Sequence, residues 1–192
     1  MSENSMEARF GKPIPAWLYC EETQQPFTNC TLCNISLEDT SYTVCKSFSR
    51  LSLESEPILS FEIAVCLSCS QNYSNHISDE TKKALDALSR TYPKLKPSIT
   101  ADVILNGDTQ LQKPTCAITN KPTEALYEYE LSAFVSKNYV LGGANMIGEE
   151  AMKLMSDCLS DESSGFLDDF FNSLIDLPPE ISVILRDKKL IF

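Results

Sequence analysis

Two short stretches, Cys30-Thr31-Leu32-Cys33 and Cys66-Leu67-Ser68-Cys69, decide how this chain of 192 residues folds. Each is a C-x2-C pair, in which a tight turn of the backbone brings two sulfur atoms to one side. Two such pairs supply the four ligands of a tetrahedral site, and soft thiolates select zinc over magnesium or calcium. The spacing predicts that one Zn²⁺ ion is bound by Cys30, Cys33, Cys66 and Cys69.

The use of cysteine also indicates a compartment. The chain has eight cysteines, which is sparse for a small secreted protein held together by disulfides. Residues 1–7 contain two glutamates and no apolar stretch, unlike a secretory signal. We therefore expect a cytoplasmic location, where paired cysteines bind metal or carry out redox chemistry.

The segment between the pairs, residues 34–65, is longer than the roughly 15–20 residues of common zinc ribbons. The added length costs only roughly 0.6 kcal/mol in loop closure, whereas zinc binding contributes on the order of 10–16 kcal/mol. Alternating apolar residues predict two strands in this segment, at 42–48 with one buried face and at 58–65. The second strand leads directly into the second cysteine pair.

This order of elements (knuckle, hairpin, second pair, helix) resembles the treble-clef class of zinc proteins, with the zinc ribbon as a close alternative. The resemblance covers residues 28–91. It implies a closed, structural site with the four cysteines named above as ligands and with no catalytic water. Cys20 and Cys45 lie near enough in sequence for a contribution to the metal site to stay open.

Further along the chain, strand and helix patterns alternate. Helical spacing runs from Tyr73 to Leu88, with either a start at Ser70 or a new N-cap at Ser78. Beyond it, the patterns predict a short apolar segment at 103–105, a strand at 126–135, a turn at Gly142-Gly143 and a helix at 147–158. A further helix at 161–175 should be capped by Ser160, and the apolar stretches 181–185 and 190–192 should pack as a strand.

Together these elements predict an α+β protein. We expect a treble-clef or zinc-ribbon-like module with its N-terminal arm and following helix over residues 1–91, a linker over residues 92–100, and a mixed α/β C-terminal half over residues 101–192. The sequence does not decide the oligomeric state.

A faint internal repeat links the two halves. The stretch Cys30-x2-Cys33-Asn34 and the stretch Cys116-x2-Thr119-Asn120 each precede a β-like segment with a phenylalanine at the same distance. Coincidence and a degenerate repeat of residues 30–49 at residues 116–135 both stay open. Because no second C-x2-C pair follows Thr119, such a repeat would not hold zinc in the same way.

Composition excludes several classes of function. The formal charge of −11 repels phosphate backbones and argues against general nucleic-acid binding. No apolar run approaches the roughly 20 residues that cross a bilayer. A single histidine leaves little material for a Ser-His-Asp triad or a histidine-rich catalytic zinc site, so no catalytic residues are assigned.

The sequence therefore favours a non-enzymatic protein that acts through contacts with a protein partner, a basic one given the acidic surface. Two alternatives stay open. Cys66 and Cys69 follow a strand at a helix N-terminus, where a dithiol can cycle with a disulfide in a redox protein or sensor. A zinc sensor or carrier differs from a structural site only in holding exchangeable metal.

Overall fold

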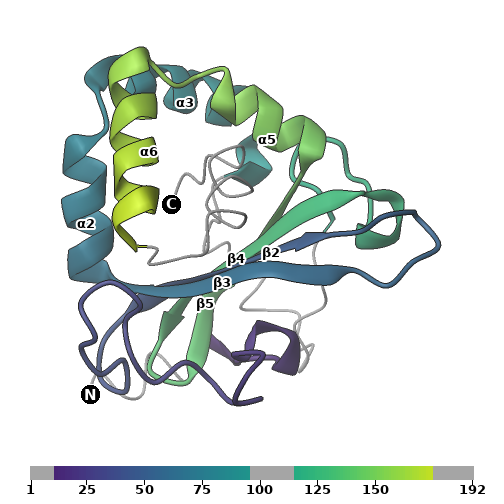
Figure 1. Cartoon of the computed structure of the whole chain (residues 1–192), viewed down its shortest axis with the longest axis vertical. Coiled ribbons are helices and arrows are strands. Elements are labelled where there is room, and N and C mark those ends of the chain that lie inside the picture. Colours follow the sequence, from purple (N-terminus) through teal and green to yellow (C-terminus); the bar gives the residue numbers. More distant parts are fainter. Residues whose placement is uncertain (1–10, 96–114, 175–192) are drawn as a thin grey trace.

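The computed structural model describes residues 11–95 and 115–174 (Figure 1). It is a mixed α+β fold around one five-stranded antiparallel sheet, with the strand order β1-β5-β4-β2-β3. The strands are β1 (Gly11–Pro13), β2 (Tyr42–Ser49), β3 (Ile58–Cys66), β4 (Glu128–Ser136) and β5 (Tyr139–Gly148). The apolar segment expected at 103–105, the strand stretches expected at 181–185 and 190–192, and the linker beyond residue 95 lie outside the described residues.

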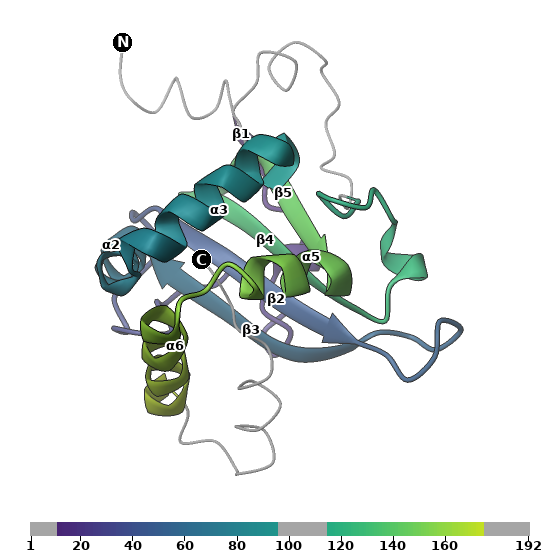
Figure 2. The same ribbon diagram turned by 90° about the horizontal axis from the view of Figure 1, so that it is seen from above.

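Four helices of the described residues cover one face of the sheet (Figures 1 and 2). They are α2 (Leu67–His76), α3 (Asp79–Thr91), α5 (Glu149–Ser156) and α6 (Asp161–Leu174). The N-terminal segment packs on the opposite face, where Ile14, Leu18 and Leu37 join Val44 of β2 in one buried cluster. The sheet therefore lies between two layers, and both of its faces contribute to the core.

This sandwich corrects the prediction that β2 has a single buried face. Tyr42 and Val44 face the N-terminal segment, as alternation suggests, and are almost inaccessible. Cys45, on the other face, is also buried, because Tyr73 of α2, Ile77 and Leu167 of α6 pack against it. Alternation along one strand does not reveal that helices from distant parts of the chain cover its second face.

The helical pattern after the second cysteine pair forms two helices. α2 ends at His76, and Ser78 caps α3 by accepting a hydrogen bond from the Thr81 amide at 3.1 Å. The alternative of a new cap at Ser78 is thus confirmed. α3 carries Asp79 and Glu80 in its first turn, where carboxylates favour the helix dipole.

In the second half, the predicted strand, helix and N-cap are present as β4, α5 and Ser160, whose hydroxyl accepts a hydrogen bond from the Ser163 amide at 3.3 Å. The turn predicted at Gly142-Gly143 is wrong. Both glycines lie inside β5, where the pairing with β4 shifts register between Ala133 and Phe134. A glycine pair thus marks an irregularity within a strand rather than its end.

The four long strands β2, β3, β4 and β5 are arranged as two equivalent hairpins. In the sheet, β3-β2 and β4-β5 lie back to back about the β2–β4 pair, and each hairpin is followed by two helices. Tyr42 lies opposite Cys66 in the first hairpin, and Tyr129 lies opposite Gly148 in the second. When Tyr42 is matched with Tyr129, Phe48 becomes the counterpart of Val135. The sequence repeat matches Phe48 with Phe134 instead, so the two alignments differ by one residue.

The helices obey the same approximate two-fold symmetry. The caps of α3 and α6 meet, with 2.8 Å between the hydroxyl oxygens of Ser78 and Ser160. The Ser78 amide donates to the Ser163 hydroxyl at 2.9 Å, and the Ser160 amide donates to the Thr81 hydroxyl at 2.9 Å. These reciprocal bonds show that the repeat is structural and extends well beyond residues 116–135.

Candidate metal centre

The first cysteine pair lies in a tight turn. The Cys30 amide donates to the Ile35 carbonyl at 2.9 Å, and the Asn34 amide donates to the Cys30 carbonyl at 2.9 Å. Closing the turn requires a left-handed residue, and Asn34 has a φ of 57°. Asparagine tolerates this conformation better than most residues with a side chain, so the asparagine after the pair is a local signal for the knuckle.

The knuckle is attached to the edge of β3. The Thr31 amide donates to the Ala64 carbonyl at 2.8 Å, and the Ala64 amide donates to the Thr31 hydroxyl at 3.0 Å. Ala64 precedes Cys66 by two residues, so these bonds hold the first pair beside the second. Sequence analysis did not identify Thr31 as a positioning residue, since a threonine inside a C-x2-C pair carries no specific signal by itself.

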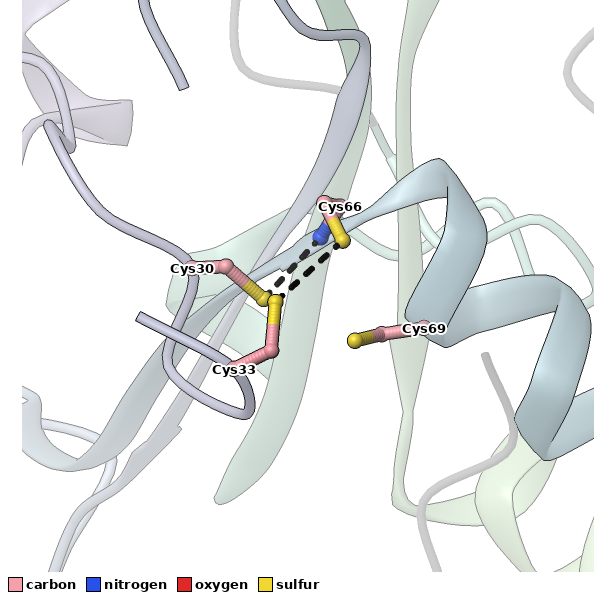
Figure 3. Close-up of side chains that lie close together, drawn as sticks. All are labelled: Cys30, Cys33, Cys66 and Cys69. Carbon is pink, nitrogen blue, oxygen red and sulfur yellow. Dashed lines mark hydrogen bonds between the residues drawn. The ribbon is translucent and has the colours of Figure 1, made fainter. Parts of the chain in front are cut away.

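The second pair occupies a junction between strand and helix. Cys66 is the last residue of β3 and the N-cap of α2, and Cys69 lies in the first turn of that helix. This places both sulfur atoms on the side of the helix start that faces the knuckle, as Figure 3 shows.

The four predicted ligands come together. The sulfur atoms of Cys30, Cys33, Cys66 and Cys69 all lie within 4.8 Å of one another, and those of Cys33 and Cys66 are 3.8 Å apart. Four sulfurs at the usual Zn–S distance of about 2.3 Å have tetrahedral edges of about 3.8 Å. The donor set is therefore compatible with a metal ion that prefers four thiolates.

The site is closed on its inner side. Cys30 and Cys66 are each 2% exposed, whereas Cys33 is exposed and Cys69 is half-buried. A bound ion would thus have the buried Cys30 and Cys66 on its inner side and the exposed Cys33 on its solvent side. Such partial enclosure suits a structural site that is filled during folding.

Hydrogen bonds prepare one of the thiols for ionisation. Burial alone would raise the pKa of Cys30, but donation from the backbone amides of Cys66, Cys33 and Leu32 outweighs it and lowers the pKa to about 7. The bond from the Cys66 amide to the Cys30 sulfur measures 3.4 Å. A thiolate at Cys30 is therefore accessible near neutral pH, and metal ligation requires the thiolate form.

The other pair behaves in the opposite way without a cation. Burial raises the pKa of Cys69, and the neighbouring sulfurs of Cys33 and Cys66 raise it further. Burial likewise raises the pKa of Cys66. Several thiolates so close together repel one another, and a divalent cation removes this repulsion. Ligation of a divalent cation at these sulfurs would offset the repulsion and lower their pKa values.

The remaining cysteines lie outside this group. Among the described residues, the metal-compatible cluster contains neither Cys20 nor Cys45. Cys45 is buried among apolar side chains below the helices. Cys116 is fully buried, whereas Cys158 is half-buried. All eight cysteines are free thiols.

Cys116 begins a second knuckle with the same hydrogen bonds. Its amide donates to the Lys121 carbonyl at 2.8 Å, the Asn120 amide donates to its carbonyl at 2.8 Å, and Asn120 also has a φ of 57°. The Gly148 amide donates to the Cys116 sulfur at 3.4 Å, as the Cys66 amide does to Cys30. Yet Thr119, Gly148 and Ala151 stand where the first half has its other three cysteines.

No described helix is long and apolar enough to cross a membrane. Comparison with known proteins returned no significant match to any protein-family model, curated protein or solved structure.

Proposed function

We propose that the chain is a non-enzymatic, cytoplasmic protein with a structural Zn²⁺ site formed by Cys30, Cys33, Cys66 and Cys69. The observation that carries this proposal is the convergence of four sulfur atoms from two distant pairs within 4.8 Å. The order of knuckle, hairpin and helix supports a treble-clef arrangement, because Cys66 and Cys69 come from a strand end and the first turn of a helix. A zinc ribbon would instead take its second pair from a hairpin turn.

In this proposal, zinc holds the N-terminal segment on the sheet. The knuckle joins β3 through the few hydrogen bonds of Thr31 described above, and metal binding on the order of 10–16 kcal/mol would dominate that attachment. We further propose that residues 1–91 form the zinc-bearing unit and residues 101–192 its metal-free counterpart, joined at residues 92–100. The repeated hairpins and helices support this division.

The function itself lies, in this proposal, in contacts with a protein partner. The formal charge of −11 favours a partner with basic groups. Among the described residues, the candidate ligand set consists of four cysteines. Four protein ligands fill a tetrahedral site, so no coordination position would stay open for the water of a catalytic zinc site.

The redox alternative uses the same residues in another way. A Cys66–Cys69 dithiol would need a thiolate stabilised at the start of α2, but burial raises the pKa of both thiols. These pKa directions argue against a reactive dithiol at Cys66 and Cys69. A sensor or carrier would use the same four ligands with faster metal exchange, and the exposed Cys33 is the point where a chelator would approach.

Metal analysis of the purified protein tests the proposal. We expect about one zinc per chain, and we expect the double variant Cys30→Ser/Cys66→Ser to lose it. Cys158→Ser is the matched control, because Cys158 lies outside the cluster, and it should retain the metal. A well-folded, metal-free native protein with four reactive thiols at these positions would overturn the proposal in favour of redox chemistry.

Resistance to chelators separates the structural site from the carrier. A structural ion should remain bound through hours of exposure to EDTA and leave only as the protein unfolds. Rapid, reversible removal without a change in the circular dichroism spectrum would identify exchangeable zinc instead.

A further inference from the structure

The two outer edges of the sheet differ in what covers them. β5 is flanked by β1, with Lys12 opposite Val140 and Pro13 opposite Tyr139. β3 is the outermost strand on the other side, and no strand of the described residues pairs with its outer edge. An uncovered strand edge offers a row of backbone donors and acceptors to another chain.

The internal repeat identifies which part of β3 corresponds to the covered part of β5. In the first hairpin Ser49 lies opposite Ile58 and Phe48 lies opposite Leu59. In the second hairpin Ser136 lies opposite Tyr139 and Val135 lies opposite Val140. Since Phe48 is the counterpart of Val135, Leu59 is the counterpart of Val140.

The repeat also gives the direction of the backbone groups. The Ile14 amide donates to the Asn138 carbonyl. In an antiparallel pair, hydrogen-bonded positions recur at every second residue, so Val140, two residues after Asn138, also points its N–H and C=O toward β1. By equivalence, Leu59 turns its N–H and C=O away from β2. Closer to the metal site, the same outer edge is already covered, because Ala64 bonds to Thr31 of the knuckle.

The surface beside Leu59 has the character of an interaction site. Ile58 is 63% exposed, and Leu51 in the loop between β2 and β3 is 92% exposed. Glu54 and Glu56 are exposed in the same loop. This loop forms the tip that projects beyond the sheet at the right of Figure 1. Apolar side chains next to carboxylates match an extended segment that alternates apolar and basic residues.

We propose that the outer edge of β3 at Ile58–Ser60 binds an extended segment of a partner protein, containing lysine or arginine, as an additional antiparallel strand. This proposal rests on the proposed function, because it specifies where and how the protein partner proposed above would bind. β1 is the precedent within the chain, as an extended segment with Lys12 at its centre on the equivalent edge. A second copy of this chain is disfavoured, because antiparallel pairing about Leu59 would place Glu56 of each copy opposite Glu62 of the other, so that like charges face each other.

Amide hydrogen exchange on the full-length, zinc-loaded protein provides the first test. Leu59 and Val140 are matched amides at equivalent positions, one uncovered and one covered. We expect the Leu59 amide to exchange at least about 100-fold faster than the Val140 amide. Equal, strong protection of both would overturn the proposal, because another segment of this chain would then already occupy the edge.

The second test adds peptides. An octapeptide of four Lys-Val repeats should slow exchange at Leu59 at least about tenfold and shift the amide resonances of Ile58–Ser60, while four Glu-Val repeats should not. Leu59→Pro removes the outward N–H and should abolish binding. Equal binding of both peptides, or resonance shifts confined to other strands, would overturn the proposal.

A charge variant protects the test against a folding defect in Leu59→Pro. Glu54→Lys/Glu56→Lys changes only exposed side chains of the loop and should reverse the preference between the two peptides. An unchanged preference would overturn the proposed role of these carboxylates. Zinc content measured on the same samples separates the two hypotheses: a metal-free fold contradicts the structural site, whereas a zinc-loaded protein with a protected Leu59 contradicts only the edge.

Discussion

Lys46 shows how a single charged residue is accommodated inside the sandwich. Its side chain is 3% exposed in the middle of β2, and its ammonium group lies 3.1 Å from the Glu62 carboxylate. It also donates to the Tyr19 carbonyl at 2.6 Å. Glu21 approaches at 3.8 Å but is 63% exposed on its side chain, so solvent screens its contribution. Lys46 thus connects the N-terminal segment to the sheet.

Removing this ammonium should destabilise the fold. Lys46→Ala leaves the Glu62 carboxylate, 15% exposed, without its counter-ion, and we expect the free energy of unfolding to fall by about 2–4 kcal/mol. Urea denaturation at constant zinc concentration measures the change. Lys46→Met is the matched control, because it keeps the buried aliphatic part of the side chain and removes the charge. Lys46→Met/Glu62→Leu should recover most of the lost stability, since an apolar pair leaves no isolated charge. A full loss in the double variant would contradict this explanation.

At the scale of residues, the sequence predicts the candidate metal ligands better than the residues that hold them in position. The spacing of the two pairs identified the four cysteines that the structure brings together, because C-x2-C has a local geometry of its own. Thr31 acts through a strand more than thirty residues away, and the partners of Lys46 lie on two separate segments, the N-terminal segment and β3. No local pattern encodes such contacts, so only the folded chain reveals them.

At the scale of elements, the junction between α3 and α6 determines how the helices assemble. Each helix is capped by its own serine, and each capping serine also donates its amide to the cap region of the other helix. Thr81 and Ser163, which provide the accepting hydroxyls, are fully buried. The sequence indicated the N-cap at Ser160 and offered Ser78 as one of two helix starts. It did not indicate that the two caps meet, because cap motifs describe one helix at a time.

The shared caps predict coupled stability. Ser78→Ala and Ser160→Ala should each lower the free energy of unfolding by about 1–2 kcal/mol. Because the two hydroxyls are 2.8 Å apart, the double variant should deviate from additivity by about 0.5 kcal/mol or more. Ser74→Ala is the control, since the Ser74 hydroxyl bonds to the carbonyl of Ser70 within its own helix. Strict additivity in a double-mutant cycle would mean that the helices do not depend on this contact.

The errors at this scale have a common cause. Gly142-Gly143 was assigned to a turn and β2 to a half-exposed strand, both from local patterns. The register shift inside β5 and the helices over Cys45 follow from pairing between segments distant in the chain. Secondary-structure propensity describes which conformations a segment tolerates, whereas pairing and packing with other segments determine which conformation it adopts.

At the scale of the whole molecule, the approximate two-fold symmetry explains why, among the described residues, four cysteines converge at the first knuckle and not at the second. Both knuckles are closed by the same hydrogen bonds and by an asparagine with a φ of 57°. In the second half, the fully buried Leu126 packs against Gly148 at the place that corresponds to Cys66. Apolar packing there takes the position that the clustered cysteines take in the first half.

This equivalence predicts that a second site can be built. A Cβ added at Gly148 would lie 2.7 Å from the Leu126 Cδ2, so space must be made first. The variant Thr119→Cys/Leu126→Ala/Gly148→Cys/Ala151→Cys, together with Cys116, places four thiols on the second knuckle. We expect metal analysis to rise from about one zinc per chain to about two. The loss of Leu126 costs about 2–5 kcal/mol, which zinc binding outweighs.

The matched control keeps the packing change and removes the ligands. Thr119→Ser/Leu126→Ala/Gly148→Ser/Ala151→Ser has nearly the same volumes but three hydroxyls in place of thiols, and it should retain about one zinc. Cobalt substitution gives an independent readout, because tetrahedral thiolate coordination produces a characteristic visible absorption. If the cysteine variant folds but its zinc content matches that of the serine control, the second knuckle is not a counterpart of the first, and the strand equivalence that assigns Leu59 to the position of Val140 loses its support.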